Sequence, residues 1–225
     1  MDQVRIIEVK QSVFADNNRD ADRLRGELSA RGTFLLNVMS SPGSGKTTTL
    51  VQAINRLKDR LKIAVMEADI DSDKDARTVS RETGVDAVQL HTGGMCHLDA
   101  EMTRQGVYDL WAHNRQDYDL IILENVGNLV CPAEFDTGAH RSITILSVPE
   151  GDDKPLKYPL MYQVSSLALI NKMDVLPWFD FNPEQCREYI ARRNPDCAVL
   201  PISAKTGEGI DEFCRWLEKA CESVK

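Results

Sequence analysis

Ser40-Ser41-Pro42-Gly43-Ser44-Gly45-Lys46-Thr47 is the stretch that decides the fold of this chain. An apolar run at residues 33–39 precedes it and predicts a buried strand, and the apolar spacing of residues 46–60 predicts a helix. A strand, a glycine-rich turn and a helix form the context in which a P-loop binds phosphate groups. Gly43 and Gly45 let backbone N–H groups turn toward an anion, and the start of the helix adds the positive end of its dipole.

The side chains of this loop predict a site for a nucleoside triphosphate with Mg²⁺. Lys46 can reach the β- and γ-phosphates, and the hydroxyl of Thr47 can ligate Mg²⁺. Ser40 stands where the P-loop pattern has glycine, so the step from strand to loop must form without the freedom of glycine. The predicted phosphate-binding residues are Gly43, Ser44, Gly45, Lys46, Thr47 and Thr48.

Size and composition bound the function. The chain has 225 residues, of which 42% are hydrophobic, and this suits one large α/β domain. Its net charge of −8 argues against a general attraction for nucleic acid or anionic lipid. Because residues 1–10 lack an apolar signal core and the longest apolar runs are of strand length, we expect a cytoplasmic protein with no membrane span.

Alternating strands and helices predict an α/β fold with a doubly wound, mostly parallel sheet and helices on both faces. We expect residues 1–32 to form an N-terminal extension with a helix at about 17–31, and residues 33–225 to form the P-loop nucleotide-binding domain. Residues 1–15 are expected to be extended or irregular, and residues 149–159 to form a polar loop. The other predicted strands are residues 63–66, 87–90, 119–124, 143–148, 167–170 and 198–202. The other predicted helices are residues 74–83, 98–114, 183–193 and 210–221.

Acidic residues follow two of the predicted strands, at the edge where parallel α/β sheets bind ligands. We expect Asp69 to face Mg²⁺ or the attacking water, with Asp75 as the second choice, although aspartates also suit the start of a helix. Glu124 stands where P-loop proteins carry the Walker B carboxylate. Lys46, Asp69 and Glu124 are therefore the predicted catalytic residues. Hydrolysis is expected to be slow, because no glutamine near Glu124 can orient the water.

Asn171-Lys172-Met173-Asp174 follows a predicted strand and predicts that the bound base is guanine. The carboxylate of Asp174 can accept from both N1–H and N2–H₂ of guanine, a pair that adenine does not offer. Asn171 can contact the other edge of the base or tie loops together, and the stem of Lys172 can lie over the ring. In Ser203-Ala204-Lys205, after the next strand, a backbone N–H can donate to guanine O6. GTP and GDP are thus the predicted ligands.

Cys96, His97 and Cys131 form a candidate site for Ni²⁺ or Zn²⁺, because thiolates and imidazole suit these metals. A single cysteine is more often a small buried hydrophobe, and three ligands leave a four-coordinate metal incomplete unless a two-fold dimer axis supplies each loop twice. The nucleotide state can move Cys131, because its loop begins at Glu124, and the metal must then alter nucleotide affinity in return. His140 is a weak further candidate. We expect the remaining cysteines to pack in the interior: Cys186, Cys197, Cys214 and Cys221.

Several of these stretches resemble the HypB family of hydrogenase nickel-incorporation GTPases, which are SIMIBI-class P-loop GTPases. The matching stretches are residues 40–47, 92–100, 124–132, 150–153 and 171–174. The resemblance implies a GTPase that helps to deliver nickel to the large subunit of [NiFe]-hydrogenase together with a partner chaperone, HypA. It implies a GTP-promoted homodimer, with Cys96, His97 and Cys131 binding Ni²⁺ or Zn²⁺ at its interface. Lys157 looks like a family lysine that approaches the nucleotide.

The chain departs from some relatives in one respect. Residues 1–32 contain no cysteine and no histidine, so we expect neither the N-terminal Cys-x-x-Cys-Gly-Cys nickel site nor a histidine-rich store.

Three other interpretations remain open. The UreG family of urease accessory GTPases is similar but carries a Cys-Pro-His motif. A regulatory GTPase would switch a protein partner and need no metal. A P-loop kinase would place the acceptor of the phosphoryl group in the loop at residues 69–75.

Overall fold

The computed structural model describes residues 5–8, 14–69, 72–114 and 117–225. Eight strands in these residues form one sheet in which every neighbouring pair is parallel, in the order β1-β4-β3-β5-β2-β6-β7-β8. This topology confirms the predicted doubly wound fold. The strands are β1 (Arg5–Glu8), β2 (Phe34–Ser40), β3 (Ile63–Asp69), β4 (Asp86–His91), β5 (Leu120–Glu124), β6 (Arg141–Ser147), β7 (Ser165–Asn171) and β8 (Ala198–Pro201).

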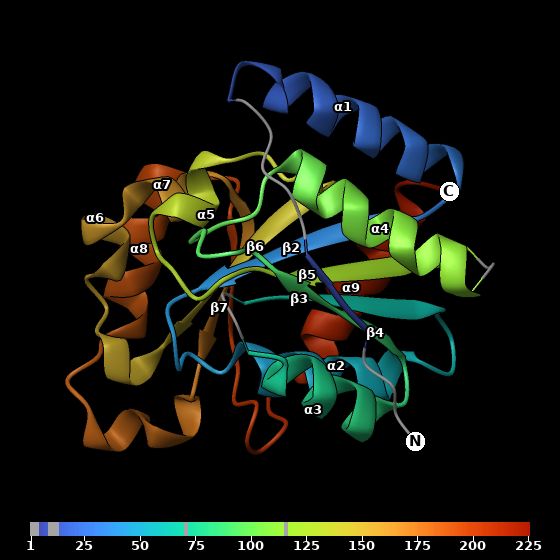
Figure 1. Cartoon of the computed structure of the whole chain (residues 1–225). Helices are drawn as coiled ribbons and strands as arrows, with labels where there is room; N and C mark the ends of the chain where they lie inside the picture. The colour runs from blue at the N-terminus through green and yellow to red at the C-terminus, as the bar shows by residue number, and fades with distance from the viewer. Residues whose placement is uncertain (1–4, 9–13, 70–71, 115–116) are drawn as a thin grey trace.

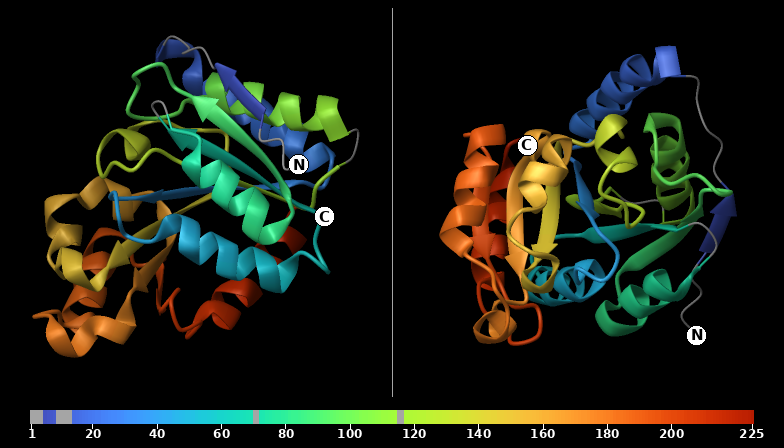
Figure 2. Two further views of the ribbon diagram at one scale, coloured as in Figure 1. Left: turned by 60° about the horizontal axis from the view of Figure 1, so that its bottom comes forward. Right: turned by 90° about the vertical axis from the view of Figure 1, so that its left-hand side faces the viewer.

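Helices cover both faces of the sheet (Figure 1). One face carries α1 (Phe14–Ala30) and α4 (Ala100–Asn114), and the other carries α2 (Lys46–Leu57), α3 (Lys74–Thr83) and α9 (Ile210–Glu222). Figure 2 shows β1 at one edge of the sheet and α7 and α8 near the other. The remaining helices are α5 (Cys131–Glu134), α6 (Lys154–Lys157), α7 (Pro159–Gln163) and α8 (Pro183–Arg193). Within the described ranges, no helix is both long and apolar enough to cross a bilayer.

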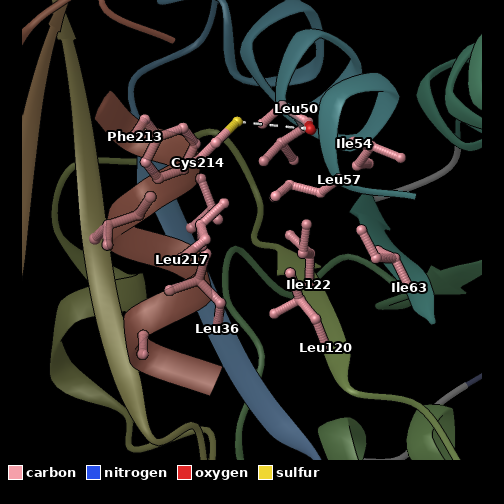
Figure 3. Close-up of a cluster of buried hydrophobic side chains, with 14 of the residues drawn as sticks. Leu36, Leu50, Ile54, Leu57, Ile63, Leu120, Ile122, Phe213, Cys214 and Leu217 are labelled. Atoms are coloured by element: carbon pink, nitrogen blue, oxygen red, sulfur yellow. Dashed lines mark hydrogen bonds between the residues drawn. The ribbon is translucent and has the colours of Figure 1, made fainter. Parts of the chain in front are cut away.

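The alternation of side chains along β2 divides the core between the two faces. Phe34, Leu36 and Val38 pack with α2 and α9, whereas Leu35 packs with α1 and α4. Figure 3 shows the first of these clusters, in which Leu36 faces Phe213 and Leu217 of α9 and residues of α2. Cys214 lies in this cluster and donates a hydrogen bond to the carbonyl of Ala53 at 3.8 Å. The four cysteines that were predicted to pack in the interior are all buried: Cys186, Cys197, Cys214 and Cys221.

Two short elements differ from the sequence prediction. Residues 5–8 form strand β1, which pairs with β4, although residues 1–15 carry little strand signal; the other residues of that range up to 13 lie outside the described part. Residues 149–159 do not form a simple loop, because they contain the four-residue helix α6 and the start of α7. Helices of about one turn leave no periodic apolar pattern, so proline at the first turn was the only available signal.

Packing of α9 against α2 is a substantial contribution to stability, and it can be measured with one substitution. Phe213→Ala removes a fully buried ring and should lower the free energy of unfolding by about 3–5 kcal/mol. Trp178→Ala is the control, because this side chain is 76% exposed and its loss should change the same quantity by less than about 0.5 kcal/mol. Urea unfolding followed by circular dichroism measures both. Equal losses for the two variants would contradict this account of the core.

Candidate functional site

Hydrogen bonds to Ser40 join the start of the P-loop to its end. Ser40 is the residue that departs from the usual P-loop pattern. Ser40 is fully buried, and its hydroxyl accepts hydrogen bonds from Ser44 Oγ at 2.7 Å and from Lys46 Nζ at 3.0 Å. Gly45 has φ of +96°, and a Cβ placed on it would lie 2.5 Å from Asn171 Nδ2, so this position requires glycine. The serine hydroxyl thus supplies a fixed polar anchor where other P-loops rely on the freedom of glycine.

A cavity of about 610 Å³ opens above the loop, at the carboxyl ends of β3 and β5. Its lining includes eight of the residues predicted from the sequence: Gly43, Gly45, Lys46, Thr47, Thr48, Asp69, Asp75 and Glu124. Thr47 Oγ1 donates to Glu124 Oε1 at 3.0 Å, and Lys46 Nζ lies 4.0 Å from the same oxygen. The carboxylate of Asp69 accepts from the Ser72 N–H at 2.9 Å, which joins the end of β3 to the segment that begins at Ser72. Lysine, hydroxyl and carboxylates therefore meet in one cavity, as phosphate and Mg²⁺ binding require.

Glu67 is a cavity residue that the sequence analysis missed. It lies on β3 directly opposite Glu124 on β5, and both side chains are almost fully buried. Burial raises the pKa of Glu67, and the neighbouring Glu124 raises it further. Burial also raises the pKa of Glu124, against the opposing effect of Lys46. The available signal was an acidic residue inside an otherwise apolar strand, since such a charge is stable only beside a partner or a cation.

Oxygen atoms in this cluster fit a hard cation. Glu67 Oε1 and Glu124 Oε2 are buried and have no hydrogen-bond partner among the described residues. Mg²⁺ prefers carboxylate and hydroxyl oxygens, so Thr47 and Glu124 offer it a suitable pair of ligands. The geometry therefore agrees with the donor set that a bound nucleotide with Mg²⁺ needs.

Asn171 joins the predicted guanine-binding segments to the P-loop. Its Nδ2 donates to the carbonyl of Ser44 at 2.9 Å, and its Oδ1 accepts from the N–H of Ala204 at 3.0 Å. Lys172 has a φ of +63° and donates from Nζ to the carbonyl of Gly43 at 2.6 Å. Asn171 therefore fixes the distance between the P-loop and the segments predicted to bind the base.

The other residues predicted for the base are held together beside this junction. Asp174 Oδ1 accepts from Ser203 Oγ at 2.7 Å, and Lys205 Nζ lies 4.0 Å from its other oxygen. Lys157 is not part of this arrangement, because it lies exposed on α6 and pairs with Asp153 at 2.5 Å. The side chain of Lys157 does not line the cavity.

Cys96, His97 and Cys131 come together as a possible metal centre. One ligand atom from each lies within 4.8 Å of the others, and no other such group occurs in the described ranges. Cys96 and His97 belong to the loop between β4 and α4, and Cys131 is the first residue of α5. Cys96 Sγ lies 3.8 Å from His97 Nδ1. Two sulfur atoms and one imidazole at this spacing match the ligand preferences of Zn²⁺ and Ni²⁺.

The surroundings of the imidazole favour its metal-binding form. His97 stacks on Phe135 with ring centroids 3.7 Å apart, and burial lowers the pKa of His97, so the neutral ring is favoured. His97 Nε2 is buried and has no hydrogen-bond partner in the described part of the chain. A hydrogen bond with Cys131 raises the pKa of the Cys96 thiol, so protons and metal compete for the sulfur pair.

His140 does not belong to the metal centre. Its Nδ1 accepts from the N–H of Leu35 at 3.0 Å, its Nε2 lies 2.9 Å from Ser29 Oγ, and its ring stacks on Phe34. Both nitrogens are thus occupied in packing α1 against β2. Sequence proximity to Cys131 had suggested a ligand, but the hydrogen-bond partners of His140 lie on α1 and β2.

Comparison with known proteins gives the family. The CobW/HypB/UreG nucleotide-binding domain profile matches residues 34–201. The chain belongs to the CobW/HypB/UreG family. This result confirms the resemblance found in the sequence.

Relatives within the family carry the HypB name. The hydrogenase maturation factor HypB of Escherichia coli K12 is 46% identical over 218 residues, which cover 97% of this chain and 74% of the relative. The probable hydrogenase maturation factor HypB of Methanocaldococcus jannaschii is 36% identical over the full length of both chains. The crystal structure of Helicobacter pylori HypB in complex with nickel is 38% identical, with a TM-score of 0.85, and covers 93% of this chain and 97% of its own.

A more distant structure agrees in fold alone. The signal recognition particle receptor FtsY of Elizabethkingia anophelis, in complex with GDP, is 15% identical with a TM-score of 0.54. It covers 87% of this chain and 72% of its own. The family relationship therefore rests on the profile match and on the HypB relatives, and the FtsY structure adds only that the sheet and its helices share one architecture.

The burial of His140 predicts a pH-dependent stability. Burial, with Arg25 nearby, lowers the pKa of His140 from 6.5 to about 4. Between these values the unfolded chain binds more protons, so the free energy of unfolding should fall as the pH drops from 6.5 toward 4. His140→Gln should reduce this loss when urea unfolding is compared at about pH 7.5 and about pH 5. His113→Gln, on the exposed side of α4, is the control, and an equal change in both variants would refute the assignment.

Proposed function

We propose that this chain is a GTP-hydrolysing metallochaperone that binds Ni²⁺ or Zn²⁺ at Cys96, His97 and Cys131 and assists nickel insertion into [NiFe]-hydrogenase. The observation that carries the proposal is the single chain segment that links the two sites. Glu124, which contacts Thr47 of the P-loop, is followed seven residues later by Cys131 of the metal centre. The names of the relatives and the nickel complex of the Helicobacter pylori protein support the same function.

The cavity supports GTP hydrolysis with Mg²⁺. Lys46 can neutralise charge on the β- and γ-phosphates, and Thr47, Asp69 and Glu124 are the residues that would hold Mg²⁺. When bound, Mg²⁺ supplies positive charge to the transferring phosphoryl group. Asp69 and Glu124 also line the cavity where water must be oriented. Intrinsic turnover should be slow, because no glutamine follows Glu124 and no arginine lines the described part of the cavity.

The same contacts support coupling between nucleotide and metal. The loop that carries Cys96 and His97 also starts beside the cavity. At its beginning, the N–H of Thr92 donates to the carbonyl of Asp69 at 3.2 Å. The γ-phosphate and Mg²⁺ would therefore bias the positions of both loops that carry metal ligands. By linkage, a metal that prefers one arrangement must shift the affinity for GTP over GDP by the same factor.

The assembly and location of the protein form part of the proposal. Three ligands from one chain leave a four-coordinate metal incomplete, which favours a GTP-dependent homodimer with the centre at its interface. The expected partners are the nickel chaperone HypA and the hydrogenase large subunit, in the cytoplasm. The division into residues 1–32 and 33–225, and the approach of Lys157 to the nucleotide, stay predictions.

Asp174 should decide the base. Asp174→Asn replaces one of the two carboxylate oxygens that can accept from guanine N1–H and N2–H₂ with an NH₂ donor, so it should weaken GDP binding by about 10- to 100-fold. The variant should in turn bind xanthosine diphosphate more tightly than the wild type, because its amide can donate to the 2-oxo group. Asp180→Asn, at an exposed carboxylate six residues further along the chain, is the control. Titration with fluorescent nucleotides measures all three proteins, and unchanged GDP affinity in Asp174→Asn would contradict guanine recognition here.

Cys131 should couple metal affinity to the nucleotide. Wild-type protein should bind Ni²⁺ and Zn²⁺ with different affinities in the presence of GDP and of a non-hydrolysable GTP analogue, and Cys131→Ser should weaken binding by about 10-fold or more. Cys197→Ser is the matched control, because this thiol is buried in an apolar cluster and donates to the carbonyl of Ala198. Affinities that are weak and identical in every state would instead indicate a GTP switch that acts on partners without a metal role.

A further inference from the structure

Asn17 of α1 connects the two chain segments that carry the metal ligands. We define the first metal arm as residues 92–99, which hold Cys96 and His97, and the second metal arm as residues 125–136, which hold Cys131. Asn17 Oδ1 accepts a hydrogen bond from the N–H of Ala100, directly after the first arm, at 2.9 Å. Its Nδ2 donates to the carbonyl of Asp136, at the end of the second arm, also at 2.9 Å.

This amide lies in the interior although it belongs to a largely charged helix. Asn17 is 3% exposed, whereas its neighbour Asn18 is exposed. An amide buried in this way needs both its donor and its acceptor satisfied, and here the two partners come from two different loops. The side chain therefore holds the ends of both metal arms at a fixed separation.

The contact to the first arm completes the start of α4. The first N–H groups of a helix have no partner within it. Asp99 Oδ1 accepts from the N–H of Met102 at 2.8 Å, and Asn17 accepts from Ala100. Without Asn17, the N–H of Ala100 would be buried and unpaired, three residues after His97. The first turn of α4, and with it the ligand pair, would lose its support.

The contact to the second arm is reinforced by a second residue of α1. Arg25 Nη2 bonds both carboxylate oxygens of Asp136 at 2.8 Å, and Arg25 Nε donates to the carbonyl of Ala139. The second arm is therefore held at both ends, by Glu124 at the P-loop and by Asp136 at α1. Cys131 lies between these anchors, so a nucleotide-driven shift at Glu124 moves Cys131 relative to a fixed end.

We infer that Asn17 is a positioning residue of the metal centre, which sets the spacing of Cys131 from Cys96 and His97 and provides the fixed point against which the nucleotide moves Cys131. The inference rests on the proposed function. Ligand geometry controls metal affinity even where the ligands themselves are unchanged, because the groups that orient them are part of the site. The N-terminal helix is thereby a component of the metal centre, although it contributes no ligand.

The test compares Asn17→Ala with the matched variant Asn18→Ala in the full chain. Asn17→Ala should bind Ni²⁺ about 10-fold more weakly, the lower limit for loss of a group that supports metal ligands. The thiolate-to-nickel absorption bands should change in position or intensity, and the difference in nickel affinity between GDP and a non-hydrolysable GTP analogue should shrink. GDP affinity should stay unchanged, because Asn17 does not line the nucleotide cavity. Asn18→Ala should match the wild type in every measurement.

Two further variants separate positioning from stability. Leu28→Ala removes a buried side chain from the same helix and should lower stability while leaving nickel affinity within about twofold. Asn17→Asp keeps the acceptor for Ala100 but loses the donor to Asp136, so it provides a second test if Asn17→Ala does not fold. Its nickel affinity should lie between those of the wild type and Cys131→Ser.

The outcomes distinguish this inference from the function on which it rests. If Cys131→Ser loses nickel and wild-type binding depends on the nucleotide, but both Asn17 variants bind nickel like the wild type, the inference is wrong and the proposed function stands. The inference is also wrong if Leu28→Ala weakens nickel binding as much as Asn17→Ala does. If Cys131→Ser and the wild type bind nickel alike, the proposed function itself fails.

Discussion

The contact between the carboxylate of Glu124 and the P-loop is the constraint on which the rest of the structure depends. A buried carboxylate is stable only with donors or a cation close to it. Thr47 and Lys46 provide those partners, and they are the residues that we propose to face the phosphates and Mg²⁺. Any change in the ligand of the P-loop therefore changes the environment of Glu124. Because the second metal arm begins at the next residue, the proposed coupling runs along the chain from Glu124 to Cys131.

The parallel sheet explains why both sites lie at one edge. In such a sheet all strands end on the same side, so the loops after neighbouring strands meet. The P-loop follows β2, Asp69 ends β3, the first metal arm follows β4, and the second follows β5. Since β3 lies between β4 and β5, Asp69 separates the starts of the two arms and contacts the first through its carbonyl. The cavity and the Cys96–His97–Cys131 group thus lie at neighbouring strand ends.

Local patterns predicted the strand–loop–helix units and their order, whereas contacts between distant residues could not be predicted. The P-loop, Asn171 and the Cys96–His97 pair were recognisable because each motif lies within a few consecutive residues. Glu67 was missed because its significance depends on register with Glu124 on another strand. Asn17 bonds a residue 83 positions away and another 119 positions away, which no local pattern encodes. His140 was misjudged for the same reason, because its partners lie on α1 and β2.

The position of α1 follows from the same requirement for paired polar groups. A helix with a largely charged surface gains modest stability from its apolar contacts alone, here Leu24 and Leu28 among others. Its polar residues add contacts that apolar packing cannot supply, because Asn17 and Arg25 pair backbone and carboxylate groups of two loops. The N–H of Ala100 lies in the first turn of α4 and the carbonyl of Asp136 lies just after α5, so neither group is paired within its own helix. The segment that appeared from the sequence to be an extension therefore completes the hydrogen bonding of the metal arms.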